Sequence, residues 1–201
     1  NTAVFIRSLD VVQTQNVFSV FQQFELDFNG IGEQLDRVIV NAGMGKGGSI
    51  GKGYAAANIE TAQTNFCGAL TQMEAAMEIF RAQNHGHLVL ISSMSAFRGY
   101  SRAMTVYAAT KAGLKSLAEG LRVDVLHKPI IVSSIFPGYI ATEMTEALEA
   151  SPPFMVSLDK GSKLLVKAIN REKPTAYVPF WPWFFAKRLM PFMTVGMLRR
   201  F

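Results

Sequence analysis

Short apolar segments alternate along the chain with longer segments of helical periodicity, and this alternation restricts the possible folds most strongly. The apolar segments lie at residues 3–9, 36–43, 87–93, 130–136 and 176–180, and the helical patterns lie at 11–28, 58–83, 104–127 and 157–172. Strands separated by helices of this length predict a parallel sheet with right-handed crossovers. We therefore predict an α/β fold with a doubly wound parallel sheet flanked by helices.

Composition excludes several other classes of protein. A chain of 201 residues with 49% hydrophobic and 17% charged residues is long and apolar enough for one folded domain. The net charge of +5 is spread along the body without a basic block, so we expect no nucleic-acid partner. A single cysteine, Cys67, fits a reducing compartment. With no signal peptide or membrane-spanning apolar run in the sequence, we expect a cytoplasmic location.

Residues suited to ligand binding follow four of the predicted strands. They are Asp10, Asn41–Gly43, Ser92–Ser93 and Pro137–Gly138. In parallel α/β sheets, ligands bind beyond the carboxyl ends of the strands. These residues are therefore expected to gather at one edge of the sheet.

The stretch VYAATKAG, residues 106–113, places Tyr107 and Lys111 on the same face of a predicted helix. An ammonium near a phenol lowers the phenol pKa from about 10, and general acid/base catalysis works best near the operating pH. The alternative is a solvated helix whose lysine stem simply lies along apolar surface.

Four motifs in the same order resemble the classical short-chain dehydrogenase/reductases. "NAG" follows one strand, "ISS" the next, "YAATK" opens the following helix and "FPGYIAT" follows the strand beyond. The resemblance extends over residues 3–180 and implies a Rossmann-type catalytic domain over 1–180, followed by a C-terminal tail at 181–201. It also implies hydride transfer between a nicotinamide cofactor, NADP(H) ahead of NAD(H), and a ketone or secondary alcohol.

The resemblance assigns roles to individual residues. Tyr107 would be the general acid/base, Lys111 would lower its pKa and hold the nicotinamide ribose, Ser93 would bind the substrate oxygen, and Asn65 would hold a water of the proton relay. The implied cofactor-binding residues are Asp10, which would meet the adenine, and Val11, Asn41, Ala42, Gly43, Tyr107, Lys111, Pro137, Gly138, Ile140 and Thr142.

Several of these assignments have alternatives in the sequence. Ser92 or Ser95 could replace Ser93, because the 14-residue separation of Ser93 from Tyr107 is one longer than usual in the family. Asn65 could be a helix-surface asparagine, Asp10 could cap the following helix, and Pro137–Gly138 could be a plain turn. His85 and His87 have no apparent third ligand, so we expect no metal site.

The family's phosphate-binding signature, T-G-x-x-x-G-x-G, does not occur in the 201 residues. The pattern starts at what would be the third strand, so we expect the first βαβ unit to be missing. Either that segment exists outside these residues or the chain is truncated. We favour the first explanation, because a sheet without its central strands would expose apolar edges. A truncated chain would be a non-enzymatic scaffold or sensor with an incomplete cofactor site.

The region after "FPGYIAT" corresponds to the family's substrate lid. Met144, Leu148, Phe154 and Met155 predict an apolar pocket for a hydrophobic, lipid-like or steroid-like ketone. The helices at 58–83 and 104–127 are those the family uses to dimerise, so we expect a homo-oligomer, either a dimer or a tetramer.

The tail combines aromatic side chains with Lys187, Arg188, Arg199 and Arg200. It predicts either a peripheral membrane contact through residues 180–201 or packing against the protein itself or a partner subunit. We favour packing, because Pro182 and Pro191 interrupt any long helix.

Overall fold

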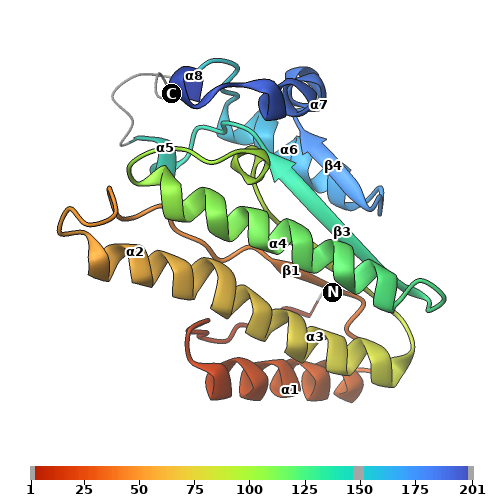
Figure 1. The fold of residues 1–201 in the computed structure, drawn as a ribbon. Helices are drawn as coiled ribbons and strands as arrows, with labels where there is room; N and C mark the ends of the chain where they lie inside the picture. The colour runs from red at the N-terminus through yellow and green to blue at the C-terminus, as the bar shows by residue number, and fades with distance from the viewer. Residues whose placement is uncertain (1–2, 147–151, 199–201) are drawn as a thin grey trace.

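The computed structural model describes residues 3–146 and 152–198, and its centre is a four-stranded parallel sheet (Figure 1). The strands follow the order β1-β2-β3-β4, with every neighbouring pair parallel. Their bounds are Arg37–Val40 for β1, Gly86–Ile91 for β2, Ile130–Pro137 for β3 and Thr175–Val178 for β4. The predicted parallel α/β fold is confirmed, and four of the five predicted strands form.

Helices connect the strands as the periodicity predicted. The α-helices are α1 (Thr14–Gly30), α2 (Ala55–Ala62), α3 (Ala69–Gln83), α4 (Met104–Asp124), α5 (Glu143–Glu146), α6 (Leu158–Ile169), α7 (Phe180–Leu189) and α8 (Val195–Leu198). A π-helical turn, η1 (Gln63–Gly68), joins α2 to α3, and 3₁₀ turns form at η2 (Met94–Phe97) and η3 (Met190–Phe192). The predicted helix at 58–83 is therefore one continuous run with a π-helical insertion.

Helices cover both faces of the sheet. Figure 1 shows α3 and α4 in front of the strands and α6 behind them, while α1 lies against α3. The core of the first face includes Val17, Phe21, Phe80, Leu88, Leu90 and Leu114. On the second face, Val89 and Ile135 pack against Ala168 and Ile169 of α6. Burial on both faces explains the near-continuous apolar runs of β2 and β3, whereas Ile39 of β1 is 46% exposed.

The prediction of a strand at residues 3–9 is wrong. Residues 3–10 have no regular secondary structure and lie along α1 instead, where Arg7 forms an ion pair with Asp27. The rings of Phe5 and Phe28 meet edge to face, with their centroids 5.7 Å apart. A strand is stabilised by its ladder of hydrogen bonds with a neighbour, and no strand of the described residues pairs with this segment. Apolar composition alone therefore did not produce a strand.

The C-terminal segment packs beside β4 at the carboxyl end of the sheet (Figure 1). Trp183 of α7 is buried together with Phe136 and Tyr177 of the two last strands. Trp181 has non-helical backbone angles directly before Pro182, so this proline interrupts the helix as predicted. Within residues 3–146 and 152–198, none of the helices is long and apolar enough to cross a bilayer.

Candidate active site

The end of β2 and the first turns of α4 are joined by two hydrogen bonds around Lys111. The Lys111 ammonium donates to the carbonyl oxygen of Ile91 over 2.9 Å. In the opposite direction, the Ser92 hydroxyl donates to the carbonyl oxygen of Lys111, also over 2.9 Å. Both side chains are buried. These bonds fix α4 against the strand end that carries the serine motif.

Tyr107 lies one turn before Lys111, and its phenol is near enough to the Ser93 side chain for that hydroxyl to lower the phenol pKa. Ser93 Oγ also accepts a 3.1 Å hydrogen bond from the Ser95 amide, which orients the hydroxyl. Ser92 is committed to the Lys111 carbonyl, and the buried Ser95 hydroxyl has no partner among the described residues. Of the three candidate serines, Ser93 is therefore the one that the fold places at the tyrosine.

The pKa of the Tyr107 phenol is raised, which is opposite to the direction expected from its spacing to Lys111. Burial has the largest effect, the nearby Ser93 side chain opposes it, and nearby Tyr139 adds to it. The Lys111 ammonium lies 5.7 Å from the centre of the Tyr107 ring and bonds to Ile91 instead of the phenol oxygen. Burial lowers the pKa of Lys111 itself to about 8.

Asn65 is fully buried inside the π-helical turn, so it is not a helix-surface asparagine. Its Oδ1 accepts from the Met44 amide over 2.7 Å, and its Nδ2 donates to the Met44 carbonyl over 2.8 Å. Thr110, on the same helix as Tyr107, lies 3.4 Å from Nδ2. Inserted π-turns are frequent at functional sites, and this one connects the loop after β1 to α4.

The loop after β1 brings Gly43 to the same place. A Cβ at Gly43 would lie 3.3 Å from Asn65 Oδ1 and 3.4 Å from Lys111 Nζ. Asn41 and Ala42 immediately precede it, after the last residue of β1. Gly43, Asn65 and Lys111 are thus adjacent to one another at the carboxyl ends of the strands.

Asp10 and Val11 lie at the other end of the π-helical turn. A Cβ at Gly68 would lie 2.9 Å from the Val11 carbonyl oxygen, so the two segments are in close contact. The Asp10 carboxylate accepts from the Val12 amide over 3.2 Å. Since α1 begins at Thr14 and its N-cap is Gln13, Asp10 closes a turn before the helix and is not its cap.

The segment Pro137–Thr142 leaves β3 and runs past α7. The Gly138 amide donates to the Val178 carbonyl over 2.8 Å, and Ile140 is buried. The Thr142 amide donates to the Thr145 hydroxyl, also over 2.8 Å. A Cβ at Gly138 would overlap the indole of Trp183, so only glycine allows this close approach. The segment is therefore more than a plain turn.

Sequence reasoning predicted Phe154 as a lid residue but missed the other two members of an aromatic group beside this segment, Tyr139 and Trp183. Tyr139 and Phe154 meet the Trp183 indole edge to face, with ring centroids 5.8 and 6.3 Å apart. Tyr139 stands inside the "FPGYIAT" motif, which was a usable signal, whereas nothing in the tail singled out Trp183. Of the expected lid residues, Leu148 and the Met144 side chain lie outside the part that the structure describes.

The residues present suit the nicotinamide end of a dinucleotide. Gly43 leaves the backbone without a side chain beside Asn65 and Lys111. An ammonium has three N–H donors, and Lys111 uses one of them on Ile91, so two remain for ribose hydroxyls. The described residues contain no cluster of ligands for a metal ion, and His87 instead contacts Ser133 and accepts from Arg37.

The fold and the site together define a Rossmann-type α/β oxidoreductase. The family model described as short chain dehydrogenase matches residues 1–153. An uncharacterized oxidoreductase of Mycobacterium tuberculosis is 44% identical over 98% of this chain and 76% of the relative. The chain belongs to the short-chain dehydrogenase family.

Two further comparisons show how far the likeness extends. The human 3-oxoacyl-[acyl-carrier-protein] reductase is 30% identical over 71% of this chain and 58% of its own length. The crystal structure of a short chain dehydrogenase from Burkholderia cenocepacia, in complex with NADP, has a TM-score of 0.76 and 20% identity, covering 90% of this chain and 72% of that one. At that identity, the structural likeness is one of fold.

Proposed function

We propose that the protein transfers hydride between NADP(H) or NAD(H) and a ketone or secondary alcohol. The carrying observation is that the Tyr107 phenol lies near both the Ser93 hydroxyl and the buried Lys111 ammonium. NADP(H) is the first choice because it is bound in the structural neighbour from Burkholderia cenocepacia. The chemistry supplied by the nicotinamide, when it is bound, is the donation or acceptance of hydride at the carbonyl carbon.

The remaining steps belong to residues of this chain. In the reduction direction, the Ser93 hydroxyl holds the substrate oxygen and the Tyr107 phenol gives it a proton. The raised pKa keeps the Tyr107 phenol protonated before the reaction, although it also makes the phenol a weaker acid than its spacing to Lys111 predicted. Lys111 holds the ribose with its two remaining donors, and Asn65 fixes the loop at Met44 and orders the water of the proton relay.

A hydrophobic substrate fits the side chains beside this site. Tyr139, Phe154 and Trp183 present an aromatic group next to the segment that follows β3. Tyr139 is near enough to Tyr107 to raise its pKa, so the aromatic group borders the reacting hydroxyl. Aromatic surfaces of this kind bind the apolar body of a ligand while few polar groups orient it.

Replacing Tyr107 by Phe tests the proposal. The variant loses the proton donor but keeps the ring, so we expect turnover of carbonyl substrates to be abolished and cofactor binding, followed by tryptophan fluorescence, to remain. Tyr54→Phe is the matched control, since Tyr54 is exposed on the loop before α2. Near-normal turnover in Tyr107→Phe would refute the role. Failure of the wild-type protein to bind any nicotinamide cofactor would favour a scaffold or sensor.

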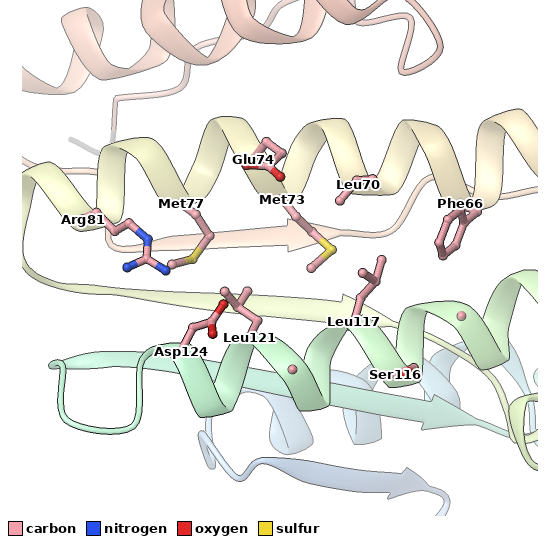
Figure 2. Close-up of a pocket in the computed structure, with 12 residues that line it drawn as sticks. Phe66, Leu70, Met73, Glu74, Met77, Arg81, Ser116, Leu117, Leu121 and Asp124 are labelled. Atoms are coloured by element: carbon pink, nitrogen blue, oxygen red, sulfur yellow. The ribbon is translucent and has the colours of Figure 1, made fainter.

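We also propose that the protein is a homodimer formed through α3 and α4. A hollow of about 570 Å³ lies between these helices, lined by apolar side chains such as Leu70, Met73 and Leu117, with Arg81 and Asp124 at one end (Figure 2). It is lined by neither Ser93 nor Tyr107, so it is not assigned to substrate. Leu70→Arg should convert a dimer to a monomer in light scattering, and a wild-type monomer would contradict the proposal.

A further inference from the structure

The C-terminal segment exposes a row of large apolar side chains, which we call the C-terminal apolar surface. Its members are Phe180, Trp181, Phe185, Leu189, Phe192, Val195 and Met197, with exposed fractions between 48% for Phe185 and 83% for Phe192. They lie on α7, η3 and α8, which occupy the same end of the molecule (Figure 1). Contiguous exposed apolar patches mark interaction sites.

The opposite side of the same segment is firmly attached to the protein. Trp183 is buried against the ends of β3 and β4, and the Lys187 ammonium donates to the Tyr177 hydroxyl over 2.5 Å. The Arg98 guanidinium donates to the Met193 carbonyl over 2.6 Å, which holds the stretch after η3. The exposed apolar residues therefore belong to a fixed surface, whose inward-facing residues already form part of the core.

Charge identifies the partner that this surface fits. In the described part of this segment, residues 180–198, the chain has no acidic residue but has two cations, Lys187, which bonds Tyr177, and Arg188, which is exposed. A two-fold contact between copies would place like charges against each other, because the same patch meets itself. Anionic lipid headgroups are complementary to this charge, and each basic residue near them adds to the attraction.

The types of apolar residue agree with a lipid surface. Aromatic rings, tryptophan above all, favour the boundary between headgroups and acyl chains, and Trp181 is 67% exposed. Short amphipathic elements with basic residues lie in the plane of this boundary. We propose that the C-terminal apolar surface docks the protein peripherally on an anionic lipid bilayer. This inference does not depend on the proposed reaction.

Sedimentation with lipid vesicles tests the proposal on the full chain. We expect the protein to pellet with vesicles of phosphatidylcholine and phosphatidylserine, much less with phosphatidylcholine alone, and less as the salt concentration rises. Each of Trp181→Ser, Leu189→Ser and Phe192→Ser should weaken partitioning by about tenfold, because each removes a partly inserted apolar side chain. These side chains face solvent, so the variants should fold.

The matched control is Val123→Ser with Leu126→Ser, two side chains that are 73% and 71% exposed at the far end of α4. This pair should pellet like the wild-type protein. Equal loss in the control, or no pelleting of wild-type protein with anionic vesicles, would overturn the proposal. A smaller oligomer in light scattering of Phe192→Ser, without vesicle binding by the wild type, would assign the surface to a second copy.

Discussion

Replacing Lys111 by Met should stabilise the fold at neutral pH while abolishing activity. Burial lowers the pKa of Lys111 from 10.5 to about 8, so the folded state holds this charge at a cost of about 3 kcal/mol at pH 7. Methionine fills similar volume without the charge. The variant loses the hydrogen bond to Ile91, and this loss cancels about 1 kcal/mol of the stabilisation gained by removing the charge. We expect a net gain of about 2 kcal/mol in the free energy of unfolding.

The pH dependence separates this explanation from better packing. Below pH 8 both folded and unfolded wild-type states carry the proton, so the full cost of burial is present. Between about pH 8 and 10.5 only the unfolded state keeps it, so wild-type stability rises with pH. The advantage of Lys111→Met should therefore shrink above about pH 8 by about 1.4 kcal/mol per pH unit, vanish at about pH 9.5 and reverse above it.

Urea denaturation at several pH values measures the difference directly. Thermal denaturation near pH 7 should show an increase of about 4–8 °C in Tm for a domain of this size. Lys115→Met is the matched control, because Lys115 lies on the same helix and forms an ion pair with Glu119 at the surface, and it should not gain stability. A Lys111→Met variant that is less stable than wild type at pH 7, or whose advantage is independent of pH, would refute the reasoning.

Three further predictions concern the surroundings of the site. Gly138→Ala should displace the Trp183 indole, because the new methyl group overlaps it, and should lower the free energy of unfolding by about 1–3 kcal/mol; unchanged tryptophan fluorescence would contradict this. Burial and a neighbouring arginine lower the pKa of His87. Below about pH 6.5 the unfolded state therefore takes up the proton more readily than the folded state, so the free energy of unfolding should fall as the pH drops. His87→Gln should flatten this pH dependence in thermal denaturation. Asn65→Ala leaves the Met44 amide without its acceptor, so hydrogen exchange of that amide should accelerate and stability should fall by about 2 kcal/mol; unchanged exchange would count against it.

Periodicity predicted the parallel sheet because helices connect the strands and because the central strands β2 and β3 are buried on both faces. It failed at residues 3–9, where apolar residues follow α1 instead of a neighbouring strand. Strand formation depends on a partner, and local composition carries no information about that partner. Periodicity also could not reveal the π-helical turn around Asn65, whose hydrogen-bond pattern lies inside a continuous helical run.

The i, i+4 spacing correctly placed Lys111 near Tyr107, but it predicted the wrong direction for the shift in the Tyr107 pKa. An i, i+4 pair places Lys111 beside Tyr107, yet the ammonium turns to the Ile91 carbonyl and burial raises the phenol pKa. Rotamer choice and desolvation belong to tertiary structure, which sequence spacing does not describe. The same holds for Trp183, whose place against Gly138 depends on how the tail returns to the sheet.

The two reciprocal hydrogen bonds between Ser92, Ile91 and Lys111 have a consequence for how the site moves. They tie the strand end that carries Ser93 to the helix that carries Tyr107, so the serine and the tyrosine belong to one rigid unit. The segments that border the proposed substrate site, around Tyr139 and Phe154, are attached to β4 and α7 instead. Changes in the shape of that proposed site can therefore accumulate without disturbing the spacing of Ser93 and Tyr107.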